Sequence, residues 1–195
     1  MVGRPRKRDP EGYAVNKIEI AFWELLEKHD FSDLTMQTLA REAGVNRNTL
    51  YYHYANLKEV AEAAFGNALP EDMAMRFLSI LLTGPEGITD NWEPMDMSGR
   101  IQRIHLFARS NSPLLRSLLK NTLLDRWFMK LGIREEELTP VDRLQLEYIL
   151  NGFIGILGSR EVADDPHILS SFPNSPAGKA AIETMIRLTK GGAHN

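Results

Sequence analysis

The stretch from Leu34 to Val60 constrains the fold of this chain more than any other segment. It opens with Thr35, a residue type that favours a helix N-cap, and apolar residues then recur from Met36 to Ala43 at the spacing of a helix with one buried face. Gly44 follows where this helix has to end, because glycine adopts at low cost the positive φ that closes a helix C-terminus. The pattern therefore predicts a short amphipathic helix followed by a tight turn.

A second short helix is predicted directly after this turn. Asn46 is suited to cap it, and Leu50 and Tyr54 lie one turn apart on its inner side. Two short helices joined by a glycine-bearing turn form a helix-turn-helix. The outward positions of the second helix hold polar and aromatic side chains suited to phosphates and base edges, where a solvated helix usually has Glu and Lys. These residues are Arg47, Asn48, Thr49, Tyr51, Tyr52 and His53.

The same geometry also fits a plain helical hairpin inside an all-α protein, but the chemistry of the outer face favours DNA binding over that alternative. In this role Arg47 is predicted to contact guanine and Asn48 adenine, with Gln37 on the preceding helix as a third base-reading residue. Thr49 is suited to either bases or phosphates. Phosphate contacts are predicted for Thr35, Tyr51, Tyr52, His53 and Lys58.

The segment LAREAGVNRNTLYYHY resembles the helix-turn-helix of the tetracycline-repressor (TetR) family of bacterial transcriptional regulators. Family members usually carry Lys three residues after the final aromatic residue of this motif, whereas here Leu57 holds that position and Lys58 follows. The resemblance implies a homodimer that binds palindromic operator DNA, usually represses transcription and is released by a small-molecule effector. It is carried by Leu39, Ala40, Gly44, Val45, Leu50, Tyr51, Tyr52 and His53, with Tyr54 where the family usually has Phe.

Three domains are predicted along the 195 residues: a flexible basic arm over 1–12, the helix-turn-helix domain over 13–60, and a helical ligand-binding and dimerisation domain over 61–195. A support helix from about Tyr13 to His29 completes a three-helix DNA-binding domain. The fold class is therefore all-α. The net charge is −3, so affinity for DNA has to come from local features and not from a cationic field over the whole protein.

The basic arm provides one such local feature, since its first eight residues carry four positive charges and no acid. Its Gly3-Arg4-Pro5 core with flanking basic residues resembles the AT-hook, a short peptide that lies in the minor groove of DNA. Arg4 and Arg6 are therefore predicted to contact DNA. A basic tail that only improves solubility is the alternative.

The C-terminal domain is predicted to contain helices at about 71–82, 97–109, 112–131, 140–160 and 176–190, separated by proline- and glycine-containing breaks. Large apolar side chains surround a few polar groups between Met73 and Leu131, a composition typical of a small-molecule cavity and equally of an ordinary core. The candidate effector-binding residues are His105, Arg109 and Trp127. If Arg109 reaches a cavity, a ligand carboxylate is its natural partner.

The helix after Pro140 is apolar nearly all round in its latter half, so it must be buried in the domain or against a partner chain. By resemblance to the family, this helix and the last one form a four-helix dimer interface. A core helix pair in a monomer is the alternative. The candidate interface residues are Gly152, Phe153, Gly155 and Met185.

Several other classes of protein are disfavoured. There is no cysteine, and the five histidines show no metal-binding spacing, so no cofactor, no metal site and no enzymatic activity are expected. The N-terminus lacks the apolar run of a signal peptide, and no stretch is long enough to span a membrane, which predicts a cytoplasmic protein. A DNA-binding structural protein without ligand control remains a further alternative.

Overall fold

The computed structural model describes residues 10–69, 97–132 and 135–191. All regular elements within these ranges are helices, which confirms the all-α prediction. The chain divides into two compact units, Met1–Asn67 and Ala68–Asn195. The predicted helix at 71–82 lies outside the described residues, as do Arg4, Arg6 and the rest of the basic arm up to residue 9.

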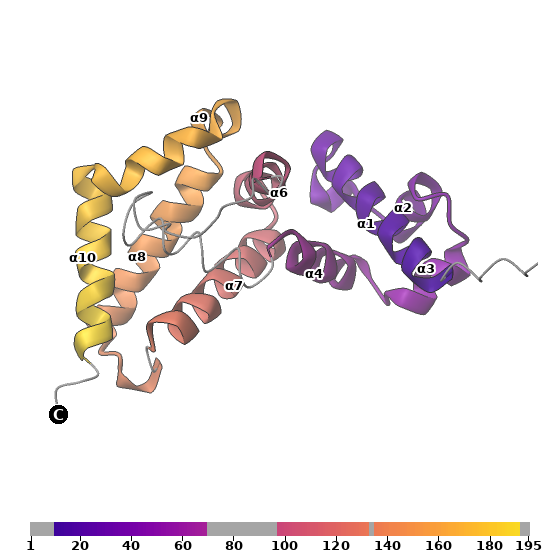
Figure 1. The fold of residues 1–195 in the computed structure, drawn as a ribbon. Coiled ribbons are helices and arrows are strands. Elements are labelled where there is room, and N and C mark those ends of the chain that lie inside the picture. The colour runs from indigo at the N-terminus through magenta and orange to yellow at the C-terminus, as the bar shows by residue number, and fades with distance from the viewer. Residues whose placement is uncertain (1–9, 70–96, 133–134, 192–195) are drawn as a thin grey trace, which may run out of the picture. The chain divides into compact units, whose positions relative to one another are not determined.

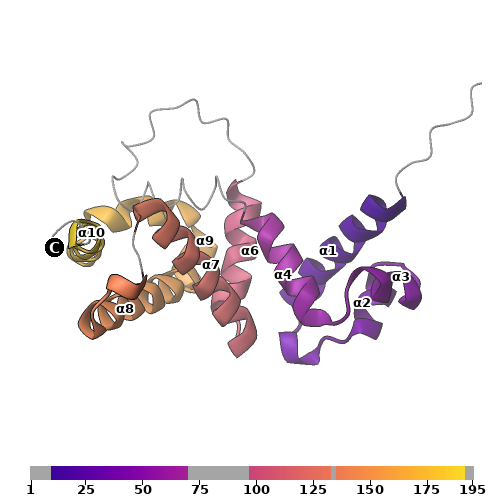
Figure 2. The ribbon, with the colours of Figure 1, turned by 90° about the horizontal axis from the view of Figure 1, so that it is seen from below.

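The first unit is a small helical bundle built on α1 (Pro10–Lys28), which packs against both helices of the helix-turn-helix, α2 (Met36–Glu42) and α3 (Arg47–His53) (Figures 1 and 2). A short 3-10 turn, η1 (Phe31–Asp33), connects α1 to α2, and α4 (Leu57–Ala68) follows the bundle. The apolar stripe of α1 packs onto the inner sides of α2 and α3, as its periodicity predicts. The fully buried side chains of this bundle include Ile18 and Phe22 of α1, Leu39 of α2 and Leu50 of α3.

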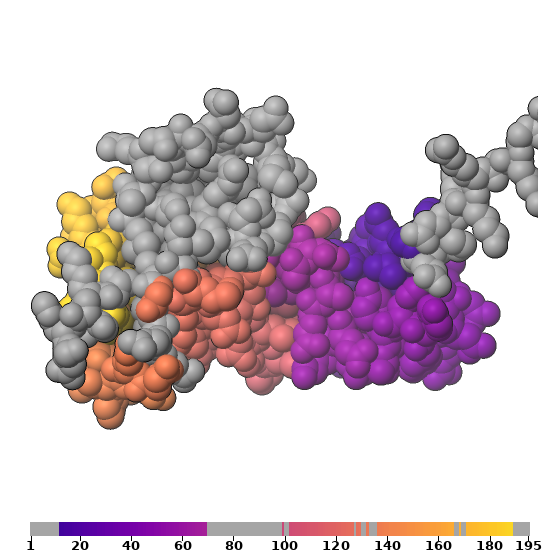
Figure 3. Space-filling model, turned by 60° about the horizontal axis from the view of Figure 1, so that its bottom comes forward, coloured from indigo at the N-terminus to yellow at the C-terminus, as the bar shows by residue number. Residues whose placement is uncertain are grey.

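The second unit contains α6 (Met97–Arg109), α7 (Pro113–Leu131) and α8 (Pro140–Leu157), which pack against one another in pairs. Leu119, Leu150 and Ile154 are fully buried among them. Two helices begin with a capping side chain before a proline: Ser112 caps α7, and Thr139 caps α8 by accepting a hydrogen bond from the Asp142 amide at 3.2 Å. On the face drawn in Figure 3, the side chains of α7 form a continuous surface.

The single helix predicted over 140–160 is two helices in the structure. Helix α8 ends at Leu157, and α9 (Arg160–Asp164) starts with Ser159, whose hydroxyl accepts from the Val162 amide at 3.4 Å. Gly158 separates them because it lies against α6: a Cβ added there would be 2.9 Å from the carbonyl carbon of Ala108. The predicted non-α stretch after residue 164 contains the 3-10 helix η4 (Pro166–Asn174), and α10 (Pro176–Gly191) follows it.

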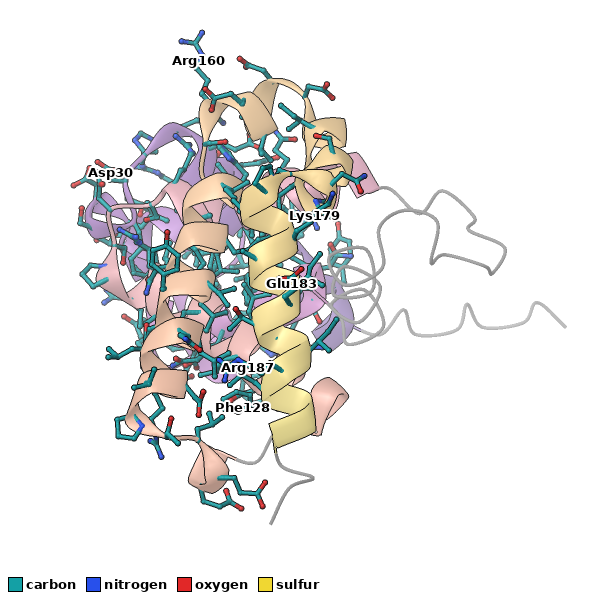
Figure 4. All side chains as sticks on the ribbon, turned by 90° about the vertical axis from the view of Figure 1, so that its left-hand side faces the viewer. Asp30, Phe128, Arg160, Lys179, Glu183 and Arg187 are labelled. Carbon is teal, nitrogen blue, oxygen red and sulfur yellow. The ribbon has the colours of Figure 1, made fainter. Side chains whose placement is uncertain are left out.

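Helices α8 and α10 lie side by side, and Figure 4 shows Arg187 of α10 directed towards α8. Its guanidinium contacts the carboxylate of Asp142 at 3.3 Å and the side-chain oxygen of Gln145. The pKa of Asp142 is held below its usual value by the hydrogen bond from the Thr139 hydroxyl and then by Arg187. No described helix is both long and apolar enough to cross a membrane.

Candidate nucleic-acid interface

The turn between α2 and α3 has the geometry that the sequence predicted. Gly44 has φ of 60°, the left-handed conformation that glycine adopts without strain. The Gly44 amide donates to the Arg41 carbonyl at 3.2 Å, and the Val45 amide donates to the Ala40 carbonyl at 3.1 Å. This pair of bonds is a Schellman motif, which satisfies two carbonyls at the end of α2 and fixes the direction in which the chain enters α3.

The start of α2 is fixed by Thr35 and Thr38. The Thr35 hydroxyl accepts from the Thr38 amide at 3.0 Å, and the Thr38 hydroxyl accepts in return from the Thr35 amide at 3.0 Å. The Thr38 hydroxyl also donates to the Thr35 carbonyl at 2.9 Å, so its proton is already used. The Thr35 hydroxyl therefore donates to the Thr38 hydroxyl at 3.1 Å, and it lies at the exposed helix N-terminus, where an anion is electrostatically favoured.

Helix α3 presents a buried side and an exposed side. Asn46 caps it by accepting from the Asn48 amide at 2.9 Å. Leu50 and Tyr54 are buried and hold the helix against α1, whereas Arg47, Asn48 and Tyr51 are exposed. Tyr52 is 73% exposed, an unusual state for an aromatic side chain that has no partner surface. Thr49 and His53 are half-buried at the edges of this face.

Two contacts order the exposed side chains of α3. The guanidinium of Arg47 lies over the ring of Tyr51, 5.5 Å from its centroid, so one turn of helix links the two residues. Tyr52 and His53 meet edge to face with centroids 5.0 Å apart. These contacts reduce the number of conformations that each side chain samples, which lowers the entropy lost on binding.

The start of α4 has a second capping arrangement, which the sequence analysis did not identify. The Asn56 side chain accepts from the Glu59 amide at 3.0 Å, and the Glu59 carboxylate accepts from the Ala55 amide at 2.7 Å. The Asn-x-x-Glu spacing is the sequence signal for this cap. Lys58 is exposed and pairs with Glu62 at 3.5 Å, an exposed ion pair that is worth little, so its ammonium group can reach a phosphate at small cost.

A polar contact ties α4 to the rest of the first unit. The Asn67 side-chain amide donates to the Glu19 carboxylate of α1 at 2.7 Å. Burial, together with the nearby negative charge of Glu19, raises the pKa of Tyr54 to about 12. The phenol of Tyr54 is therefore neutral at physiological pH, as a side chain in the interior of the unit should be.

The other candidate DNA-binding and effector-binding residues lie on helices other than α3. Gln37 is exposed on the first turn of α2. In the second unit, the Leu157 carbonyl lies 2.8 Å from His105 Nδ1, and because a carbonyl only accepts, this nitrogen carries the proton. Arg109 is exposed on the last turn of α6, and Trp127 lies on α7. The structure therefore does not place Arg109 in the interior.

The predicted dimer residues divide into two pairs. Phe153 and Met185 are buried, whereas Gly152 and Gly155 are exposed, and a Cβ added at either glycine would meet no atom within 4 Å. An open groove of about 500 Å³ runs between α8 and α10. It is lined mainly by apolar residues, among them Leu144, Tyr148, Gly152, Phe153, Ile156 and Met185. No group of three or more potential metal-ligating side chains is found in the described ranges.

A three-helix bundle with a Schellman turn between two short helices, and with hydrogen-bonding side chains exposed on the second, defines the first unit as a helix-turn-helix DNA-binding domain. Residues 21–64 match the family described as "Bacterial regulatory proteins, tetR family". The first unit therefore contains a DNA-binding domain similar to that of the tetR family of bacterial regulatory proteins. No curated protein sequence matches it.

Two solved structures are similar to the chain. The crystal structure of the TetR family repressor AlkX from Dietzia sp. strain DQ12-45-1b is 18% identical, with a TM-score of 0.45, over 96% of this chain and 100% of that one. The TetR-family transcriptional regulator HI0893 from Haemophilus influenzae is 20% identical, with a TM-score of 0.39, over 93% of this chain and 98% of that one.

Proposed function

We propose that this regulator is a ligand-responsive repressor that binds a pseudo-palindromic operator as a homodimer and leaves it when a small molecule binds. The exposed face of α3 carries the proposal. Its buried residues, Leu50 and Tyr54, orient the helix so that Arg47, Asn48 and Tyr52 face solvent together. Such a face is suited to the major groove, which admits one α-helix and distinguishes all four base pairs.

Base readout is assigned to the N-terminal end of α3. Arg47 donates two parallel hydrogen bonds to guanine, and Asn48 pairs with the edge of adenine, with Gln37 of α2 as a third base contact. Thr49 is suited to contact either a base or a phosphate. Phosphates are held by Thr35, Tyr51, Tyr52, His53 and Lys58, and Arg4 and Arg6 of the N-terminal arm add minor-groove or phosphate contacts.

A homodimer is supported by the groove between α8 and α10. Leu144 is 70% exposed and Tyr148 is 82% exposed along it, which leaves an apolar surface uncovered in a single chain. Gly152 and Gly155 leave room for a close approach of another backbone. A self-complementary surface of this kind closes into a two-fold dimer, and two copies of α3 then read two half-sites about 10 base pairs apart or a multiple of that spacing.

Release from DNA follows from ligand binding in the second unit, with His105, Arg109 and Trp127 as the first candidate residues. In one state of the dimer, the spacing of the two α3 helices does not fit the operator. A ligand that binds this state more tightly shifts the population towards it. DNA affinity then falls by the ratio of the two ligand affinities, and by reciprocity operator DNA weakens ligand binding equally.

The experiment is a binding titration of the protein against DNA from immediately upstream of its own gene, with non-specific competitor present. The Arg47→Ala variant is expected to lose about 1 to 3 kcal/mol of specific binding and to tolerate any base at one position of each half-site. Arg41→Ala is the matched control, since Arg41 is an exposed arginine on the neighbouring helix α2. Its base preference should equal that of the parent protein.

Two results would contradict the proposal. Equal operator affinity and base preference for Arg47→Ala and the parent would show that α3 does not read the bases. Binding of a single chain to each operator would show that the dimer is not the DNA-binding form.

A further inference from the structure

Glu19 of α1 lies where three helices of the first unit meet. The Asn67 side-chain amide, in the last turn of α4, donates to the Glu19 carboxylate at 2.7 Å. The Tyr54 phenol, at the end of α3, donates to the same carboxylate. Glu19 is half-buried, Tyr54 is buried and Asn67 is exposed, so one carboxylate joins the interior of the bundle to the end of α4.

Apolar packing by itself constrains the direction of α4 little. The buried face of this helix consists of Val60, Phe65 and three alanines, Ala61, Ala64 and Ala68. Burial of apolar surface has no preferred direction, and an alanine methyl group interlocks with its neighbours less than a longer side chain does. A hydrogen bond, in contrast, requires a short distance and a favourable angle. The Asn67 contact therefore adds a directional constraint to α4.

The place of this contact along α4 makes the constraint effective. Asn67 is the last residue of the first unit, and the second unit begins at Ala68. A helix of 12 residues is about 18 Å long, so moving its last turn sideways by about 1 Å tilts the helix by only about 4°. A contact at the far end of α4 thus fixes the direction of the helix more tightly than a contact near Leu57 would.

We propose that Glu19 is a positioning residue for operator binding, because its carboxylate holds Tyr54 and Asn67 together and so fixes the direction of α4 relative to α3. In a dimer formed by the second units, each α3 is attached to the dimer through α4. The separation of the two α3 helices then depends on the direction of α4, and a fixed separation favours one half-site spacing. The inference rests on the proposed homodimer and names a residue that sets its preferred half-site spacing.

The test compares two operators that differ only in half-site spacing. One is the palindrome obtained by selection from random DNA, and the other has one base pair inserted at its centre, which separates the half-sites by about 3.4 Å more and rotates them by about 34°. The ratio of the two Kd values measures how strictly the separation of the α3 helices is fixed. An unfolded fraction weakens both complexes equally, so a loss of stability alone leaves this ratio unchanged.

The main variant is Asn67→Asp, which keeps the shape of the side chain and replaces the donor amide by a second carboxylate. It should lower the Kd ratio about three- to tenfold, the range that one hydrogen bond to a charged group can contribute. Glu19→Ala should have a similar effect, and Glu19→Gln, which keeps one acceptor oxygen, should retain more of the preference. Asn121→Asp makes the same substitution at an exposed position of α7 and should leave the ratio unchanged.

Amide hydrogen exchange of the protein without DNA tests the same contact independently of any operator. In Asn67→Asp, amides in the second half of α4 should exchange faster, whereas those around the fully buried Phe22 of α1 should keep their protection. An equal loss of protection in α1 and α4 would show that the contact only stabilises the bundle, and the positioning role would be wrong.

The spacing ratio also separates this inference from the proposed function. A ratio for Asn67→Asp equal to that of the parent would overturn the role of Glu19 and leave operator binding intact. A parent that binds both operators equally would have the same meaning, since no spacing preference would then exist. Failure to select any DNA sequence would overturn the proposed function and this inference together.

Discussion

The backbone conformation of Gly44, in the turn between α2 and α3, predicts that a side chain added there lowers the free energy of unfolding. At Gly44 a Cβ would meet no atom within 4 Å, yet φ is 60°. An L-residue in this left-handed conformation costs about 1 to 2 kcal/mol, because its Cβ crowds the adjoining peptide. Alanine also reduces the entropy of the unfolded chain, which offsets about 0.4 to 1 kcal/mol. Gly44→Ala should therefore destabilise the protein by about 1 kcal/mol.

Gly66 in α4 is the matched control, since a Cβ there also meets no atom within 4 Å but the helical φ suits any residue. Gly66→Ala should stabilise the protein by about 0.5 to 1 kcal/mol through helix propensity. Gly44→Asn should cost less than Gly44→Ala, because asparagine tolerates the left-handed region.

The assay is equilibrium unfolding in urea followed by far-ultraviolet circular dichroism, which reports loss of helix. The midpoint should fall for Gly44→Ala and rise for Gly66→Ala, with unchanged slopes. A Gly44→Ala variant as stable as the parent, or a stabilisation of the same size at both glycines, would refute the argument from positive φ.

Two further predictions concern the interior of the first unit and the surface of the second. Since the folded pKa of Tyr54 is about 12 against an ordinary value of 10.0, its stabilising effect is complete below pH 10 and is lost as the pH rises through about 12. Thermal melts from pH 9 to 12 should show this loss in the parent and not in Tyr54→Phe; equal losses would contradict the assignment. Tyr148→Asp should convert the dimer to monomers in sedimentation velocity, because it places a charge in the groove between α8 and α10. Met129→Asp, at a 68% exposed apolar residue of α7, should remain dimeric, and dissociation of both variants would argue against this interface.

The helix-turn-helix could be predicted closely because its signals are local. Thr35, Gly44 and Asn46 act on backbone groups within a few residues of themselves, so their roles can be recognised without knowledge of the rest of the fold. The same reasoning missed the Asn56 and Glu59 cap, although its spacing was present. The predicted helix over 140–160 was too long because it overlooked a local signal, the C-cap Gly158 followed by the N-cap Ser159, at which α8 ends and α9 begins.

The surroundings of the candidate effector residues could not be predicted from the sequence, because they depend on contacts between distant segments. His105 is held by the carbonyl of Leu157, which is 52 residues away in the sequence, and Arg109 lies on an exposed helix end.

The sequence by itself determined the fold class and the position of the helix-turn-helix, because helix periodicity, capping and turn chemistry act over one or two turns of chain. Only the tertiary structure decided which charges have partners and which glycines face open space. Gly152 and Gly158 both belong to a set of glycines spaced three residues apart, yet one faces open space at the groove and the other lies against Ala108. Such differences arise from contacts between distant segments, and a pattern along one helix does not encode which neighbour each side will meet.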